Sequence, residues 1–231
     1  MGIDVFWKGW AVIVRKPLWV GCRFCSIFDK KFALFLLKTN GIDTLPHRFK
    51  MYFTENKREL KPIKIVVIGP ESTGKTTLAK QLADHYQTTW VKEYAREFIE
   101  NLDRDYTEND LLAIAKGQIR AEETLLAKAR TVLVCDTDLI VVQIWSEVKY
   151  GRCDDWILEQ IKVRDYDLYL LCGTDIPWEF DAQREHPAFR NELYAMYLEI
   201  LKKYPKNYVE LIGNKANRLN DSIQKIDTLL L

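Results

Sequence analysis

The stretch from Ile63 to Thr77 sets the tightest limit on how this chain can fold. Residues Ile63–Ile68 are rich in β-branched side chains and end at Gly69, which predicts a short, buried strand of a parallel sheet. Gly-Pro-Glu-Ser-Thr-Gly-Lys-Thr follows at 69–76, and a helix is expected from Gly74 onward. Glycines at both ends of this turn let the backbone curl and present its N–H groups to an anion. The pattern therefore predicts a phosphate-binding P-loop.

The residue types of this loop suit a nucleoside triphosphate with magnesium. Lys75 supplies a mobile charge for the outer phosphates, and Thr76 supplies a hydroxyl for Mg²⁺. The N-terminus of the helix that starts at Gly74 directs its dipole at the same anion. Because P-loops occur in switches, motors and kinases alike, the motif alone does not separate an enzyme from a regulator.

Strand and helix patterns alternate along the rest of the chain. Further strands are expected at 88–91, 131–135, 166–172 and 208–212, and helices at 74–86, 93–102, 108–129, 138–148, 154–164, 187–204 and 220–230. Strands separated by helices of this length imply a parallel sheet covered on both faces. The predicted fold class is α/β: a three-layer αβα P-loop NTPase with a five-stranded parallel sheet and a lid, formed by residues 61–231.

Acidic residues follow two of the predicted strands. Asp136 ends the 131–135 strand, which is where P-loop NTPases place a carboxylate that holds magnesium. Asp138 either points into the same crevice or caps the next helix. Glu93 follows the 88–91 strand and is placed to take a proton from an acceptor hydroxyl, with Arg96 one turn further on. The alternative for Glu93 and Arg96 is an ordinary charge pair on a solvated helix.

A long polar connection spans residues 174–190 and carries Arg184 and Arg190. Small-molecule kinases close such a lid over the triphosphate, and its arginines neutralise charge on the transferring phosphoryl group. A solvated surface loop is the alternative. Trp178 and Trp90 suit stacking on a flat substrate ring, or burial in the core.

The first sixty residues differ from the rest in charge. They carry eleven Lys and Arg against five Asp and Glu, whereas the remainder carries 23 against 28. Their apolar runs are too short to span a membrane, and they lack the order of a secretory signal. We interpret this extension as poorly ordered or not native, because the folded pattern begins just after Met51, where the true chain would start. The alternative is a basic, aromatic appendage that touches a membrane surface or a partner.

The cysteines and the charge indicate the cellular compartment and the kinds of partner to expect. Five cysteines at 22, 25, 135, 153 and 172 show no disulfide-framework spacing, which favours a reducing, cytoplasmic compartment. Residues 61–231 are mildly acidic, so we expect neither a nucleic acid nor a membrane as partner. We expect a small-molecule substrate, and the sequence does not fix the oligomeric state.

Four segments together resemble a known family. GPESTGKTTLA at 69–79, KEYAREF at 92–98, VLVCDTD at 132–138 and DIPWEFDAQREHPAFR at 175–190 are similar to the nicotinamide riboside kinase domain of NadR-type proteins. The resemblance covers about residues 63–228. It implies a fold like that of deoxynucleoside and thymidylate kinases.

The resemblance also implies site residues. The P-loop residues Gly69, Glu71, Ser72, Thr73, Gly74, Lys75, Thr76 and Thr77 would bind ATP. Glu93 and Arg96 would lie at the nucleoside site, and Asp136 and Asp138 near magnesium and the acceptor ribose. Arg184 and Arg190 would lie in the lid, with Trp178 and Asp181 at its start.

The reaction implied is transfer of the γ-phosphoryl of ATP, with Mg²⁺, to the 5′-hydroxyl of nicotinamide riboside, giving nicotinamide mononucleotide. Glu93 is the expected general base, with Asp136 as the second candidate. Unlike many NadR-type proteins, this sequence has no His-x-Gly-His adenylyltransferase motif. A kinase of another nucleoside and a regulatory P-loop ATPase remain alternatives.

Overall fold

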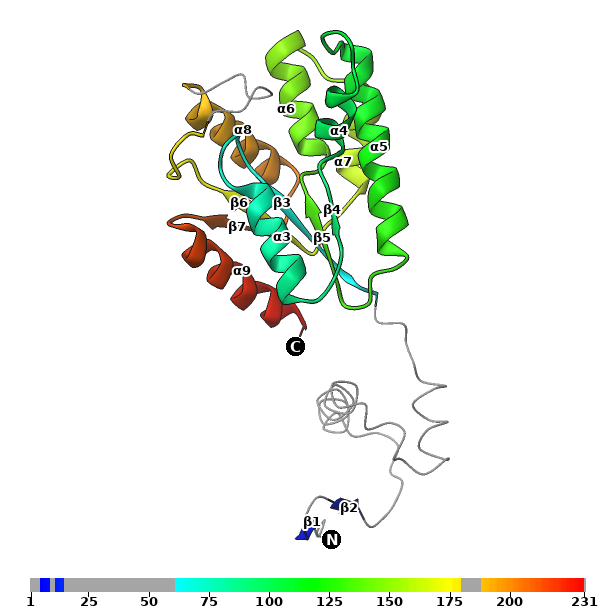
Figure 1. Cartoon of the computed structure of the whole chain (residues 1–231), viewed down its shortest axis with the longest axis vertical. Helices are drawn as coiled ribbons and strands as arrows, with labels where there is room; N and C mark the ends of the chain where they lie inside the picture. The colour runs from blue at the N-terminus through cyan, green and yellow to red at the C-terminus, as the bar shows by residue number, and fades with distance from the viewer. Residues whose placement is uncertain (1–4, 9–10, 15–60, 180–187, 231) are drawn as a thin grey trace. The chain divides into compact units, whose positions relative to one another are not determined.

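The computed structural model describes residues 5–8, 11–14, 61–179 and 188–230 (Figure 1). The chain divides into two compact units, Met1–Glu59 and Leu60–Leu231. In the first unit, β1 (Val5–Lys8) and β2 (Ala11–Val14) pair antiparallel, which the sequence patterns did not predict because the strands are only four residues long. Most of residues 1–60 lie outside the described residues, so their predicted poor order and the predicted start at Met51 stay predictions.

Five parallel strands form the centre of the second unit. They are β3 (Ile63–Ile68), β4 (Trp90–Val91), β5 (Val132–Asp136), β6 (Leu168–Cys172) and β7 (Tyr208–Leu211). Their spatial order is β4-β5-β3-β6-β7, and every neighbouring pair is parallel. The strand that leads into the P-loop, β3, therefore lies in the middle of the sheet.

Helices cover both faces of this sheet (Figure 1). One face is covered by α3 (Lys75–His85) and α9 (Lys215–Leu230). The other is covered by α4 (Tyr94–Glu100), α5 (Glu108–Leu126), α6 (Leu139–Tyr150), α7 (Asp155–Val163) and α8 (Arg190–Lys203). The predicted three-layer αβα fold with a five-stranded parallel sheet is confirmed.

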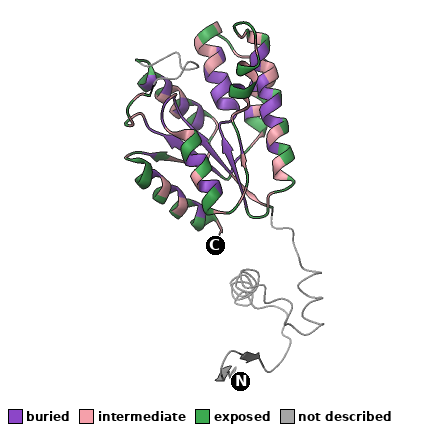
Figure 2. Ribbon diagram, viewed as in Figure 1, coloured by how far each residue is buried: buried purple, intermediate pink, exposed green. Residues whose placement is uncertain are grey.

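Side chains of β3 alternate between the two layers of the core. Val66 and Ile68 pack with α4 to α8, whereas Ile65 and Val67 pack with α3 and α9, and all four are fully buried. Figure 2 shows that burial is concentrated on the strands and on the inner sides of the helices. A strand segment buried on both faces needs an apolar side chain at every position, which explains the continuous apolar run from Ile65 to Ile68.

Two element boundaries matter for the site. The helix predicted at 220–230 begins five residues earlier, at Lys215, so its first turn lies near the carboxyl ends of the strands. The helix α5 begins after Thr107, as predicted, with a capping box in which Thr107 and Asp110 exchange hydrogen bonds.

None of the helices in the described ranges is long and apolar enough to cross a membrane.

Candidate functional site

The loop between β3 and α3 has the backbone conformation that its sequence predicts. Gly69 has a φ of 138°, and Gly74, the N-cap of α3, has a φ of 80°. A Cβ at position 69 would lie 2.7 Å from the carbonyl oxygen of Cys172 at the end of β6, so only glycine fits there. Ser72 also has a positive φ, of 55°, which costs a non-glycine residue free energy. Ser72 therefore needs support from its neighbours.

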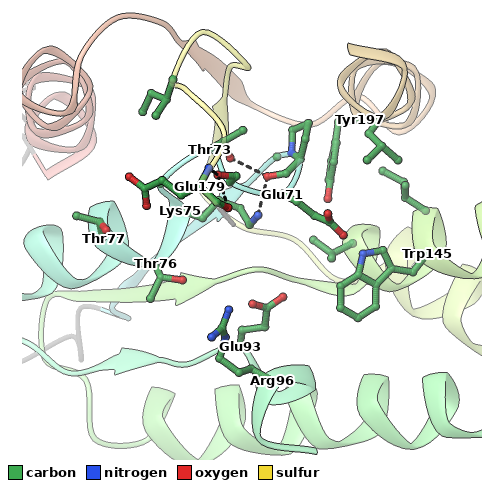
Figure 3. Close-up of a pocket in the computed structure, with 18 of the residues that line it drawn as sticks. Glu71, Thr73, Lys75, Thr76, Thr77, Glu93, Arg96, Trp145, Glu179 and Tyr197 are labelled. Atoms are coloured by element: carbon green, nitrogen blue, oxygen red, sulfur yellow. Dashed lines mark hydrogen bonds between the residues drawn. The ribbon is translucent and has the colours of Figure 1, made fainter. Parts of the chain in front are cut away.

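Two side chains of the loop bind the carbonyl oxygen of Pro70. Thr73 Oγ1 and Lys75 Nζ each donate to it at 2.8 Å, as the dashed lines in Figure 3 show. Lys75 is the first residue of α3, so its ammonium group and the N-terminus of that helix meet at the same loop. Positive charge and free backbone N–H groups thus converge where a phosphate would bind.

Arg190 stabilises Ser72 by a hydrogen bond to its backbone carbonyl. Sequence analysis predicts a catalytic lid arginine at this position, but Arg190 is the first residue of α8 and is buried. Its guanidinium group donates to the carbonyls of Ser72 at 3.1 Å and Ile176 at 2.9 Å, and lies 6.0 Å from the ring centroid of Trp178. This group binds backbone carbonyls and is not among the residues that line the pocket, so the structure shows a supporting role, and a catalytic role for Arg190 stays a prediction.

Arg218, on α9, holds the next carbonyl of the P-loop. It donates to the carbonyl of Thr73 at 2.8 Å, and also to the carbonyls of Gly173 and Gly213 at 3.1 and 2.9 Å. The carboxylate of Asp175 accepts from the same guanidinium group at 2.5 Å. One buried side chain thus joins the P-loop to the loops that follow β6 and β7. The sequence analysis missed Arg218 because it placed the start of α9 beyond it.

The first part of the predicted lid contacts the P-loop directly. Ser72 Oγ accepts a hydrogen bond from the backbone N–H of Glu179 at 2.7 Å, and Ile176 and Glu179 line the pocket. Trp178 packs beside Arg190 and is not among the residues that line the pocket, so the structure gives no support to its predicted role in substrate binding. Arg184 and Asp181 lie outside the described residues, and their roles stay predictions.

Asp136 ends β5 next to the start of α3. Its carboxyl group is buried and lies beside Thr76. Burial, and next the negative charge of Glu93, raise the pKa of Asp136 to about 6, while Thr76, Lys75 and Arg96 act in the opposite direction. Within the described ranges, Asp136 Oδ1 is buried without a hydrogen-bond partner, which is uncommon for a carboxylate.

These two residues fit a magnesium ion. A hydroxyl and a carboxylate oxygen lacking a partner are the kind of ligands that Mg²⁺ takes from P-loop proteins. No group of three or more His, Cys, Asp or Glu in the described part of the chain could hold a metal by itself. The metal predictions for Thr76 and Asp136 are thus compatible with the geometry.

Glu93 and Arg96 lie across the pocket from the P-loop. Glu93 is the N-cap of α4, directly after β4, and Arg96 stands in the first turn of that helix. Both line the pocket and point toward the P-loop side (Figure 3). The negative charge of Glu93 contributes to the raised pKa of Asp136, which is buried and is not among the residues that line the pocket. The structure thus brings these residues to the P-loop crevice, as the sequence predicts.

Asp138 has the capping role rather than a place in the pocket. Its side chain accepts from the backbone N–H of Ile140 at 3.0 Å and starts α6. It is buried and does not line the pocket. Of the two alternatives for Asp138, the structure shows the helix cap, and a contact with substrate stays a prediction. Backbone N–H groups at the start of a helix need acceptors, which explains the choice.

An aromatic and aliphatic wall completes the pocket. Trp145 from α6 and Tyr197 from α8 stand on the side away from α3 (Figure 3). The sequence analysis missed both. The available signal was helical spacing, since Val141, Ile144 and Trp145 stand at positions i, i+3 and i+4 of α6 and so share one side of that helix. The full lining comprises Gly69, Pro70, Glu71, Ser72, Thr73, Gly74, Lys75, Thr76, Thr77, Glu93, Arg96, Val141, Ile144, Trp145, Ile176, Glu179, Leu193, Tyr197 and Lys215.

The chain is similar in sequence to two curated proteins, each named trifunctional NAD biosynthesis/regulator protein NadR. The protein from Salmonella typhimurium (strain LT2) is 26% identical over 166 residues, which are 67% of this chain and 40% of that protein. The protein from Escherichia coli (strain K12) is 25% identical over 194 residues, which are 80% of this chain and 46% of that protein. The chain thus spans less than half the length of these relatives.

Solved structures share the fold. A crystal structure of NadR protein in complex with NAD and AMP-PNP has a TM-score of 0.62 and 20% identity, covering 80% of this chain and 58% of the other. One of NadR protein in complex with NR has a TM-score of 0.56 and 21% identity, covering 74% and 52%. Thymidylate kinase from Candida albicans has a TM-score of 0.58 and 17% identity, covering 73% and 92%. The predicted resemblance to NadR-type proteins is confirmed.

The family model for an AAA domain (AAA_28) matches residues 64–218, which is more than half of the chain. This range begins within β3 and includes the P-loop, Glu93, Asp136 and Arg218. All the residues that hold or line the pocket within the described ranges therefore lie inside the matched segment. The chain belongs to this AAA domain family of P-loop proteins.

Proposed function

We propose that this chain is an ATP-dependent kinase that phosphorylates the 5′-hydroxyl of nicotinamide riboside and gives nicotinamide mononucleotide. The observation that carries the proposal is one pocket in which Lys75 and Thr76 face Glu93, Arg96 and an aromatic wall. The similar NadR structures with NR and with NAD and AMP-PNP support this acceptor and this donor. Because the chain spans less than half of the curated relatives, we propose for it only this one step of NAD biosynthesis.

The P-loop side would hold the triphosphate of ATP. Backbone N–H groups of the loop and of the α3 N-terminus bind phosphate oxygens, and Lys75 turns from the Pro70 carbonyl to the outer phosphates. Thr76 and Asp136 would hold Mg²⁺, which neutralises charge on the phosphates when it is bound. Lys215, at the start of α9, lines the same side and would lie near the rest of the nucleotide.

Glu93 would act as the general base. It accepts the proton of the 5′-hydroxyl while the oxygen of that hydroxyl bonds to the γ-phosphorus. The bond from the γ-phosphorus to the bridging oxygen breaks, and its electron pair leaves with ADP. Glu93 suits this role better than Asp136, because Glu93 lines the pocket whereas Asp136 is buried and has the features of a metal ligand. Lys75 would stabilise negative charge on the transferring group.

The aromatic side would hold the nucleoside. Trp145 and Tyr197 present ring surfaces to the pocket, and Arg96 lies beside Glu93. A flat pyridinium ring stacks favourably on an electron-rich indole, which supports nicotinamide riboside as the acceptor. Cys135 and Cys172 are buried free thiols, consistent with a reducing, cytoplasmic setting for this reaction.

A direct test measures ADP release by the full chain with ATP, Mg²⁺ and nicotinamide riboside, against adenosine, cytidine and thymidine. Mass spectrometry of the product identifies nicotinamide mononucleotide. We expect the riboside to give the highest kcat/KM. Faster turnover of another nucleoside would replace the acceptor and keep the kinase. ATP hydrolysis that no nucleoside accelerates would favour a regulatory P-loop ATPase instead.

A further inference from the structure

Trp145 lines the pocket from a helix position that is only half buried, so its ring needs a neighbour to hold it in one orientation. That neighbour is Tyr106, from the connection between α4 and α5, 39 positions earlier in the chain. The two ring centroids are 6.4 Å apart, and the ring planes are inclined by 28°. Distance and angle are those of an offset-stacked aromatic pair.

Tyr106 is itself held from the next turn of α6. The ammonium group of Lys149 lies 3.5 Å from the centroid of the Tyr106 ring, a close cation–π contact. Lys149 is four residues after Trp145, so both stand on the same side of the helix. One tyrosine ring therefore packs against two consecutive turns of α6, and its position is tied to that of Trp145.

The backbone around Tyr106 is also fixed. The carbonyl of Tyr106 accepts from the Tyr150 hydroxyl at 3.2 Å. The next residue, Thr107, opens α5 through its capping box with Asp110. Arg104 closes the turn from the other end, with two hydrogen bonds to the Asp110 carboxylate at 2.7 and 3.0 Å. Tyr106 is thus presented by a well-bonded turn rather than by a loose loop.

We propose that Tyr106 is a positioning residue that determines acceptor specificity by fixing the plane of the Trp145 ring. The inference rests on the proposed function, because it takes the Trp145 side of the pocket as the acceptor side. A ring held in one orientation before binding loses little entropy when a flat base stacks on it. Tyr106 does not line the pocket, so it acts on the acceptor through Trp145.

The test compares Tyr106→Leu with Tyr106→Phe and with a matched control, Trp156→Leu. Trp156 on α7 also lies under a lysine, with Lys116 Nζ 5.2 Å from its ring centroid, but it does not line the pocket. With Tyr106→Leu we expect KM for nicotinamide riboside to rise roughly threefold to tenfold, from the size of an aromatic pair interaction. KM for ATP should stay within about twofold, and preference among nucleosides should weaken. Tyr106→Phe keeps the ring and should restore the wild-type values.

Each outcome separates this inference from the proposed function. Equal rises in KM for ATP and for the nucleoside, or the same rise in Trp156→Leu, would show a general loss of structure and overturn the role of Tyr106. If the wild-type chain prefers another nucleoside, the proposed acceptor fails, and the same variants are compared with that nucleoside. If calorimetry shows that the wild-type chain binds no nucleoside, both proposals fail.

Discussion

The phosphate side of the pocket is held by hydrogen bonds to backbone carbonyls, whereas the opposite wall is held by packed rings. Around the P-loop, Arg190 and Arg218 are buried and bind the carbonyls of residues 72 and 73. Around Trp145, the ring of Tyr106 and the ammonium of Lys149 pack at partly exposed positions. Leaving a buried carbonyl without its donor costs more than removing one partner of an exposed ring pair.

This difference matches what each side would bind. A triphosphate has the same phosphate geometry whatever the acceptor, so a P-loop that is fixed by directional hydrogen bonds suits it. Nucleoside bases differ in size and charge, and a wall of rings selects among them by shape and stacking. We therefore expect changes on the phosphate side to slow the reaction with every acceptor. Changes on the aromatic side should alter which acceptor is preferred.

The largest expected effect comes from Lys75→Ala. Removing this ammonium group takes away charge that the transferring phosphoryl group needs, so kcat/KM should fall by about 100- to 1,000-fold with all nucleosides. Lys80→Ala, an exposed lysine on the same helix, should leave turnover unchanged. Steady-state ADP release measures both. A loss confined to one nucleoside would contradict the assignment of this side to the donor.

Glu93→Gln tests whether Glu93 is the general base. Without a proton acceptor, kcat should fall by roughly 100-fold or more, while KM for the nucleoside changes little. Glu97→Gln, on the same helix but exposed, is the control. If Glu93→Gln turns over at the wild-type rate, Asp136 becomes the candidate base and the magnesium assignment has to be revised.

Arg218→Lys tests the phosphate side of the pocket, which is held by hydrogen bonds to backbone carbonyls. A lysine keeps the charge but lacks the planar fork of three nitrogens with which Arg218 reaches the carbonyls of Thr73, Gly173 and Gly213. We expect KM for ATP to rise about tenfold and KM for the nucleoside to stay the same, since roughly one buried hydrogen bond is lost. The matched control is Arg152→Lys, which alters an exposed arginine paired with Glu108. A rise in KM for the nucleoside alone would reverse the comparison between the two sides.

The smallest expected effect concerns the turn that presents Tyr106. Hydrogen bonds from Arg104, and then from Thr107, hold the pKa of Asp110 below its ordinary value. Asp110 therefore stabilises the fold at neutral pH, and this contribution shrinks as the pH falls below the ordinary value of 3.8. Asp110→Asn should lower the free energy of unfolding by about 1 kcal/mol at pH 7, a typical capping value. Urea titrations at pH 7 and pH 3 should show a smaller difference at pH 3; an equal difference would exclude the charge.

Residues whose position follows from one strand end were predictable from the sequence. Asp136 is the last residue of β5, Glu93 lies two residues after β4, and Lys75 and Thr76 open the helix that follows β3 and the P-loop. The carboxyl ends of parallel strands meet at one edge of the sheet, so local patterns sufficed to bring these residues together. The capping box at Thr107 is also a local feature, because Thr107 and Asp110 lie within one helical turn.

Residues that act across long sequence separations were not predictable in this way. Arg218 binds the carbonyl of Thr73 across 145 positions, and Arg190 binds that of Ser72 across 118. Arginine near the start of a helix is common, and nothing in the local pattern marks these two for burial. Trp145 and Tyr106 meet because two helices pack, which depends on the register of α5 against α6. The aromatic wall therefore needed the three-dimensional structure.

The bond from Arg218 to Thr73 joins α9 to the P-loop across 145 positions of the chain. On the ribosome, β3 and the P-loop sequence emerge long before α9 does. A nascent chain therefore cannot complete the support of its own phosphate site until residue 218 has left the exit tunnel. Because domains fold as units, folding of this unit requires that α9 has been translated. The P-loop therefore gains the support of Arg218 in one step, when α9 packs against the sheet, rather than gradually.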